Sequence, residues 1–299
     1  MRIIEWRVFL PINANRYEQA EQYMVARRTI NESDGNGEGI ETLDSDTSEE
    51  LGIHTHKIYH YTSRMPRIIR WALPSGMLDF HEECWAKFPR NLCKYSAPYL
   101  GERLDIAVDS YTVPFNPSSG FDNIDDNIAH LTPEELSIRE IRYMDIISQP
   151  PQSKDKELQL EGFSCPELGI PEFQKPKRKF DFHKIPEWAE TYTGTMLLTV
   201  KVVKVKFAIW GLQTRIEELL ATSAIPNIFL DSVRAIVAWA PTWSKMSPQE
   251  IEEYVNNANS SITQQFKGKD LGPPPPPIDD QKEPSTKDLN SIQDQEVNN

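Results

Sequence analysis

The chain has 299 residues, of which 38% are hydrophobic and 26% are charged, and its formal net charge is −13 at pH 7. This length is sufficient for one large domain or two ordinary ones with a substantial buried core. The acidic balance argues against a general nucleic-acid-binding protein, because such a protein needs a basic surface to meet phosphates.

The first third of the chain combines strand and helix patterns. Alternating apolar and polar residues indicate strands, and apolar residues at helical spacing indicate amphipathic helices. The turn-rich sequence of residues 31–39 is typical of a flexible connection. We expect a helix at residues 16–30 and strands at residues 3–10, 39–43 and 49–63, followed by two short helices at residues 65–73 and 78–87.

The middle of the chain returns to strand patterns, and its last third is helical. Residues 149–189 form a long, weakly periodic excursion of a kind that is usually functional or mobile. After Trp210 the pattern is helical, and a capping box at residues 247–250 starts a last helix from residue 248 to about residue 265. We expect a short helix that begins at Thr132, and strands at residues 92–97, 104–113, 138–147 and 194–207.

Several antiparallel strands, with most helices collected at the end of the chain, predict an α+β domain over residues 1–266. A sheet of this size covered by helices leaves an interior that side chains or a ligand must fill. Residues 267–299 contain five consecutive prolines among acidic and polar residues. This segment is predicted to be a disordered tail.

The cysteines and the N-terminal segment indicate the cellular compartment in which the protein is found. Cys84, Cys93 and Cys165 show no CxxC spacing, which indicates a reducing compartment rather than a disulfide framework. Glu5 and Arg7 interrupt the only apolar run near the N-terminus, so that run does not resemble a signal peptide. No run reaches the ~18–20 apolar residues of a membrane span. These features predict a soluble intracellular protein.

A group of histidines suggests a metal site only weakly. His54, His56 and His60 fall on one face of a predicted strand, with His81 and Cys84 further along the chain. No pair of these residues has a recognised zinc spacing, and no carboxylate completes a ligand set. A structural or surface role is therefore favoured, and we expect no metal.

Candidate nucleophiles and a candidate calcium loop are also weak. Cys84 or Cys93 with His81 would be the best available nucleophile and base, but no elbow or oxyanion motif surrounds either cysteine. Residues 122–127 resemble a calcium loop in composition and lack the required glycine and terminal glutamate. The sequence therefore does not predict an enzyme.

Two lysines in strand-like segments are more informative. Lys57 shares a strand face with Thr55, and Lys201 shares one with Val203 and Val205. Solvent-facing lysines on an edge strand would explain this pattern. A phosphate bound inside the domain would also explain it, because a buried lysine needs a partner. The pattern alone leaves both interpretations open.

Seven short segments carry a resemblance to a known family. They are, in chain order, EWRVFLP from residue 5, VA at residue 25, GNGEG at residue 35, THKIYH at residue 55, HEECWAKFP at residue 81, YMDI at residue 143 and WGLQTRIE at residue 210. In these segments, spread over residues 1 to about 265, the chain is similar to the phosphatidylinositol transfer proteins, which are StART-like lipid carriers.

The resemblance implies both a fold and a function. The implied fold is a strongly curved antiparallel sheet closed by long helices around an internal lipid-binding cavity. The implied function is exchange of one phosphatidylinositol or phosphatidylcholine molecule at a time between membranes, with the bound phospholipid as cargo and no cofactor. When a lipid leaves a bilayer, exposing its acyl chains to water costs ~0.8 kcal/mol of free energy per CH₂. A carrier must therefore enclose the chains in an apolar cavity. We expect a cytoplasmic monomer that contacts membranes transiently and binds no nucleic acid.

The resemblance also carries over residue roles by position. It implies that the head group is bound by Thr55, Lys57, Ser110 and Lys201. It implies membrane docking by Ile209 and Trp210, where Ile209 replaces the first residue of an aromatic pair.

Other positions depart from the family pattern. Glu21 replaces a glutamine that contacts phosphate, and Cys93 replaces a threonine. Ala86 and Val255 stand where an asparagine and a glutamate face inositol, and neither side chain can form hydrogen bonds. Asn91 occupies the position of a reactive cysteine. These changes make phosphatidylcholine or another lipid a serious competitor of phosphatidylinositol.

Three alternatives follow from these departures. Glu252 or Glu253 would restore an inositol contact if the last helix shifted its register. A phospholipid-sensing scaffold would bind lipid without transferring it, and its proline-rich tail could bind a polyproline-recognising domain, although a passive linker is favoured. A hydrolase that uses Cys93 is the least favoured alternative.

Overall fold

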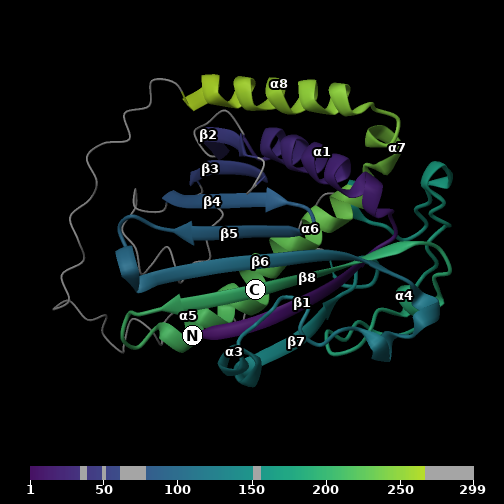
Figure 1. The fold of residues 1–299 in the computed structure, drawn as a ribbon, viewed down its shortest axis with the longest axis horizontal. Coiled ribbons are helices and arrows are strands. Elements are labelled where there is room, and N and C mark those ends of the chain that lie inside the picture. Colours follow the sequence, from purple (N-terminus) through teal and green to yellow (C-terminus); the bar gives the residue numbers. More distant parts are fainter. Residues whose placement is uncertain (34–38, 49–51, 61–78, 151–155, 267–299) are drawn as a thin grey trace.

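The fold is built on one sheet that runs through the whole molecule (Figure 1). The computed structural model describes residues 1–33, 39–48, 52–60, 79–150 and 156–266. Within them the sheet has eight strands in the order β2-β3-β4-β5-β6-β8-β1-β7. The strands are β1 (Arg2–Leu10), β2 (Gly39–Ser48), β3 (Gly52–His60), β4 (Asp79–Lys87), β5 (Arg90–Ser96), β6 (Leu104–Phe115), β7 (Arg139–Met144) and β8 (Met196–Phe207).

Helices cover one face of this sheet, and short helices and coil cover part of the other. The helices are α1 (Ala14–Glu32), α3 (Pro133–Ile138), α4 (Glu187–Thr191), α5 (Gln213–Leu219), the π-helical turn η6 (Leu220–Ala224), α6 (Ile225–Ala238), α7 (Ala240–Trp243) and α8 (Pro248–Phe266). The 3₁₀ turns are η1 (Gly101–Arg103), η2 (Pro117–Ser119), η3 (Phe121–Asn123), η4 (Lys156–Leu158) and η5 (Pro166–Leu168).

The central strands β1 and β8 are buried on both faces because each face has its own hydrophobic core. Successive strand residues point to opposite sides. Ile4, Trp6 and Val203 accordingly belong to the core under the long helices, whereas Phe9 and Val202 belong to the core on the opposite face. Both strands are therefore rich in apolar residues on both faces, although Glu5 and Arg7 interrupt β1 and three lysines interrupt β8.

The helices are fixed to the sheet and to one another by specific contacts. α1 and α8 lie side by side next to the β2 edge (Figure 1), where Tyr23 stacks on Tyr254 with ring centroids 5.0 Å apart. Nε1 of Trp6 in β1 donates a hydrogen bond to the carbonyl oxygen of Ala221 at 3.1 Å. α8 begins with the expected capping box, in which Ser247 and Glu250 accept from each other's backbone N–H groups.

Two features of the sheet differ from the sequence-based expectations. The segment predicted as a helix at residues 78–87 is strand β4, and it pairs with β3 and β5. The sheet is also not wholly antiparallel, because β7 pairs with β1 in parallel. The remaining named pairs are antiparallel, so the architecture is α+β with a mixed, mostly antiparallel sheet, consistent with a StART-like fold.

One continuous helical stretch is long and apolar enough to cross a membrane. It runs from Gln213 to Ala238, has 26 residues, and passes through α5, η6 and α6. In its most apolar window 56% of the residues are buried inside the protein. We therefore interpret it as the core helix of a globular domain, with Pro226 in the first turn of α6.

Some of the predicted segments cannot be compared with the structure. The expected helix at residues 65–73 and the tail at residues 267–299 lie outside the described residues.

Candidate functional site

The helix-covered face of the sheet carries a group of polar side chains amid apolar ones. Thr55 and Lys57 point to this face from β3, and Ser110 and Lys201 point to it from β6 and β8, as the strand registers require. β3 lies between β2 and β4, and β8 lies between β6 and β1. The interpretation of these lysines as edge-strand residues is therefore wrong.

Lys201 is the cation that lies deepest in this group. Its Nζ donates a hydrogen bond to Oγ of Ser110 at 3.4 Å and lies 4.9 Å from the ring centroid of Phe229. Among the described residues, no carboxylate lies within ion-pair distance of it. Burial lowers the pKa of Lys201, and the negative charge of Glu21 opposes that effect. The site can therefore receive an anion.

Glu21 projects from α1 toward the same group. Its Oε1 accepts hydrogen bonds from the hydroxyl of Tyr17 and from Nδ2 of Asn91, each at 2.9 Å. Burial, and then the charge of Glu21, raise the pKa of Tyr17 well above its usual range. The hydroxyls of Thr112 and Thr199 form a further hydrogen bond of 3.0 Å on this face.

A cavity of about 50 Å³ lies between α1 and the β4–β5 hairpin. Its lining includes Tyr17, Glu21, Ala86, Phe88, Asn91 and Thr112. Small-molecule sites usually measure ~300–1,000 Å³, so this cavity is too small for a whole phospholipid. The expected lipid-sized cavity stays a prediction.

The structure corrects the expectation that the cysteines form no disulfide. Cys84 and Cys93 face each other across β4 and β5, with Cα atoms 4.1 Å apart, and form a disulfide. Cys165 is a buried thiol. His81 points to the opposite face of β4 from Cys84, so the proposed pairing of a cysteine nucleophile with His81 is not formed.

The histidines lie on the opposite face of β3 and are paired with carboxylates and with one another. His54 contacts Asp46 at 3.0 Å and Glu83 at 2.5 Å, and the bond to Glu83 is the main reason that its pKa is raised. His56 contacts His81 at 3.0 Å. Within the part of the chain that the structure describes, no group of three His, Cys, Asp or Glu is placed to hold a metal ion.

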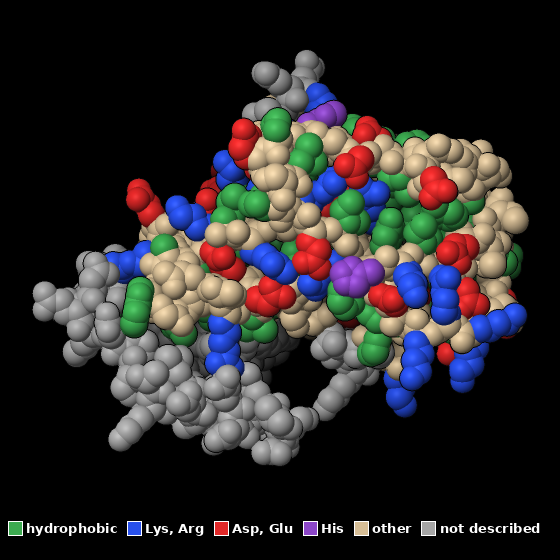
Figure 2. All heavy atoms as spheres, turned by 90° about the horizontal axis from the view of Figure 1, so that it is seen from below, with side chains coloured by type: hydrophobic (Ala, Val, Ile, Leu, Met, Phe, Trp, Pro, Cys, Tyr) green, Lys and Arg blue, Asp and Glu red, His purple; other side chains and the backbone are tan. Residues whose placement is uncertain are grey.

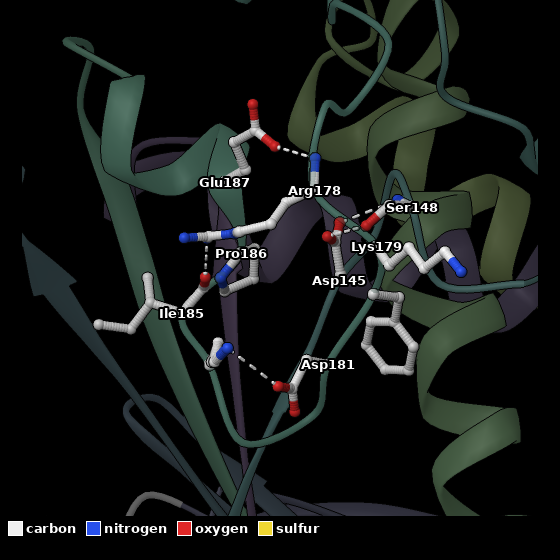
Figure 3. A pocket seen from close by; sticks show the side chains of 10 residues that line it. Asp145, Ser148, Arg178, Lys179, Asp181, Ile185, Pro186 and Glu187 are labelled. Atoms are coloured by element: carbon white, nitrogen blue, oxygen red, sulfur yellow. Dashed lines mark hydrogen bonds and ion pairs between the residues drawn. The ribbon is translucent and has the colours of Figure 1, made fainter.

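A second cavity, of about 10 Å³, lies beside α4 (Figure 3). Most of its charged groups are already paired. Glu187 accepts from the backbone N–H of Arg178 at 2.7 Å, the guanidinium of Arg178 donates to the carbonyl oxygen of Ile185 at 2.7 Å, and Lys184 lies 3.4 Å from Asp181. These contacts connect the coil to α4 and leave little room for a ligand.

The residues expected at the periphery of the site differ in their exposure to solvent. Trp210 is 74% exposed, whereas Ile209 is half-buried against the core, so Trp210 alone forms an exposed tip. Val255 is half-buried in the core, and Glu252 and Glu253 are exposed. The suggested register shift of α8 is therefore wrong.

Besides the disulfide, sequence reasoning missed the contact between Glu21 and Asn91. Glu21 and Asn91 had been recognised as separate departures from the family pattern, but in the structure they contact each other across 70 positions of the chain. The spacing of Tyr17 and Glu21 on one helix face was visible in the sequence. The contact with Asn91 required the fold.

Comparisons with known proteins point to one family. The model of the family described as "Phosphatidylinositol transfer protein" matches residues 1–260. Phosphatidylinositol transfer protein 5 of Dictyostelium discoideum is 30% identical over 88% of this chain and 87% of its own length. Phosphatidylinositol transfer protein 2 of the same organism is 26% identical over 89% and 97%. Membrane-associated phosphatidylinositol transfer protein 1 of Rattus norvegicus is 25% identical over 96% of this chain but only 22% of its own length.

Proposed function

Because the chain belongs to the phosphatidylinositol transfer protein family, we propose that it is a carrier that binds one glycerophospholipid and exchanges it between membranes. The proteins of this family are lipid carriers and not enzymes, so binding and release are the steps to be explained. The cargo classes are phosphatidylinositol and phosphatidylcholine.

The observation that carries this proposal is Lys201, a half-buried lysine whose ammonium is desolvated under the helices. A cation in an apolar interior is costly unless an anion pairs with it. Lys201 has a hydroxyl neighbour, Ser110, and no carboxylate partner among the described residues. A lipid phosphate between Lys201 and Ser110 would supply the missing charge through charge-assisted hydrogen bonds. Thr55 and Lys57 lie on the same face and would contact the rest of the head group.

The acyl chains would lie between the sheet and the helices. The core on that face is apolar and includes Phe229 and Ile216 of the helices and Val203 and Val205 of β8. Moving a CH₂ group from such a core into water costs ~0.8 kcal/mol. Lipid can therefore leave only where the protein meets a bilayer, and exposed Trp210 is the proposed contact point. We propose a cytoplasmic location with transient contact with membranes.

A transfer assay between donor and acceptor vesicles tests the proposal. The wild-type chain should move fluorescent phospholipid, and Lys201→Met should lower the rate by at least about tenfold, because a charged hydrogen bond is worth about 1.5–3 kcal/mol. Lys206→Met is the matched control, since Lys206 is exposed and points to the opposite face of β8. Equal rates for the two variants would contradict the role of Lys201, and no transfer by the wild type would contradict the carrier function.

The same assay distinguishes the carrier function from the second candidate function, that of a lipid-sensing scaffold. A lipid-sensing scaffold would retain phospholipid through purification but would transfer none above background. The 267–299 segment would then be the part that recruits a partner, and its deletion would leave lipid binding unchanged.

A further inference from the structure

We propose that Glu21, Tyr17 and Phe88 form a binding site for the quaternary ammonium of a choline head group. In this proposal Glu21 sets the preference of the protein for phosphatidylcholine over phosphatidylinositol. The inference rests on the proposed function as a phospholipid carrier and specifies its cargo.

The carboxylate of Glu21 is oriented but not neutralised. Both of its hydrogen bonds, from Tyr17 and from Asn91, come from uncharged donors and reach the same oxygen, Oε1. Within the described part of the chain, Oε2 has no hydrogen bond, and no cation lies within ion-pair distance of Glu21. A negative charge fixed at the wall of a cavity attracts a cationic ligand group.

Two aromatic rings complete the wall next to this carboxylate. The ring centroids of Tyr17 and Phe88 are 6.0 Å apart with an interplanar angle of 51°, and both residues line the 50 Å³ cavity with Glu21. Ring faces attract cations, and aromatic walls are a usual means of binding quaternary ammonium groups. A primary ammonium needs up to three acceptors, whereas a quaternary ammonium needs none and can contact the rings of Tyr17 and Phe88 directly. The aromatic part of the lining therefore favours choline over ethanolamine.

Lys201 supplies a positive charge near Glu21, so the two residues together suit a zwitterionic head group. Asn91, which holds Glu21, lies opposite Ser110 in the β5–β6 register, and Ser110 lies opposite Lys201 in the β6–β8 register. The charge of Glu21 acts on Lys201, although the two side chains are not within ion-pair distance. One negative and one positive group therefore lie over the same face of the sheet, as the ammonium and the phosphate of phosphatidylcholine require.

Two features disfavour an inositol ring. Ala86, which lines the cavity, has an apolar side chain and cannot form a hydrogen bond with a ring hydroxyl. Phosphatidylinositol also lacks a positive charge to compensate for Glu21, so its phosphate would be repelled by the carboxylate.

A competition assay with donor vesicles of equal phosphatidylcholine, phosphatidylinositol and phosphatidylethanolamine content tests the proposal. Lipid bound to the repurified protein is measured by mass spectrometry. The wild type should hold mostly phosphatidylcholine, and Glu21→Gln should lower the ratio of phosphatidylcholine to phosphatidylinositol by about tenfold. Glu102→Gln is the control, because Glu102 is exposed in η1 and does not line the cavity. Phe88→Leu should lower phosphatidylcholine content relative to phosphatidylethanolamine.

The outcomes distinguish this proposal from the proposed function. A wild type that binds and transfers no phospholipid would overturn the carrier function itself. A wild type that carries lipid, with an unchanged ratio in Glu21→Gln, would overturn only the role of Glu21. Preference for phosphatidylethanolamine over phosphatidylcholine would overturn the choline site. Should Glu21→Gln fail to fold, judged by thermal melting, Phe88→Leu and the wild-type preference decide the question.

Discussion

Lys57 and Lys201 point to the same face of the sheet but have different surroundings. Lys201 is near Ser110 and the ring of Phe229. Lys57 lies opposite Glu82 in the β3–β4 register, and Glu82 already accepts a hydrogen bond from the hydroxyl of Tyr59 at 2.9 Å. Lys57 thus lies opposite a residue that carries a carboxylate, whereas among the described residues no carboxylate lies within ion-pair distance of Lys201. We therefore expect lipid binding to affect Lys201 more strongly.

The pH dependence of stability should report the buried charge of Lys201. Burial lowers its pKa from the ordinary value of 10.5. At pH values between the lowered pKa and 10.5, the unfolded chain binds more protons than the folded one. Raising the pH within this range therefore increases the free energy of unfolding. In lipid-free protein, urea unfolding should show the wild type gaining stability relative to Lys201→Met as the pH rises toward 10.5.

Loading with phospholipid provides the control for this experiment. A bound phosphate would stabilise the ammonium and raise its pKa again, so the relative gain should disappear. A stability difference between the two proteins that does not change with pH would show that Lys201 is not buried as a charge.

The β4–β5 hairpin is the element in which sequence and structure differ most. Residues 79–87 contain the helix-favouring residues Glu82, Glu83, Ala86 and Lys87. Ladder hydrogen bonds to β3 and β5 outweigh this weak preference, as tertiary context often does. By contrast, β1 and β8 were predictable from their long strand patterns, and α8 was predictable from its capping box.

Contacts between distant elements could not be predicted from the pattern. The parallel pairing of β7 with β1 depends on the whole topology, and so does the bond between Glu21 and Asn91. The sequence did predict that Thr55 and Lys57 share a face, since that follows from alternation alone. The side chains that lie near Thr55 and Lys57 on that face come from other elements and could not be predicted from one strand.

The disulfide between Cys84 and Cys93 should stabilise this hairpin. It joins residues nine positions apart in adjacent strands, and closing a loop of this size contributes about 2–3 kcal/mol through the unfolded chain. Protein purified without reductant should show one titratable thiol in denaturant, that of Cys165, and all three after reduction.

Reduction should also lower the denaturant midpoint of the wild type but not that of Cys84→Ser, which cannot form the bond. Three titratable thiols in the unreduced protein would contradict the pairing of these cysteines.

The two ends of the molecule differ in surface chemistry. Trp210 follows β8 at the end where α5 lies, and α4 lies near the start of β8 (Figure 1). A strand of this length spans about 40 Å. Figure 2 shows Lys and Arg side chains gathered at the α4 end, where Lys175, Lys177 and Lys179 are exposed. The proposed membrane contact at Trp210 and the exposed positive charge are therefore at separate ends.

Removal of the exposed tryptophan should slow transfer without emptying the protein. Trp210→Ala removes apolar area that would enter a bilayer, and a loss of about 1.5 kcal/mol slows membrane-dependent exchange roughly tenfold. Bound lipid, measured by mass spectrometry, should be unchanged. Replacing Lys175, Lys177 and Lys179 by Gln is the control at the other end, and a greater loss of transfer there than in Trp210→Ala would place the membrane contact near α4.

The position of β1 in the sheet has a consequence for synthesis on the ribosome. β1 is buried along nearly its whole length between β7 and β8, which follow more than 100 residues later in the chain. At ~5–20 residues per second, this apolar strand waits about 10–40 s for β8 to be translated. An unpaired apolar strand is an aggregation hazard. The yield of folded protein therefore depends on how well the nascent N-terminal segment is shielded during that interval, and chains interrupted before β8 should be recovered mainly as aggregates.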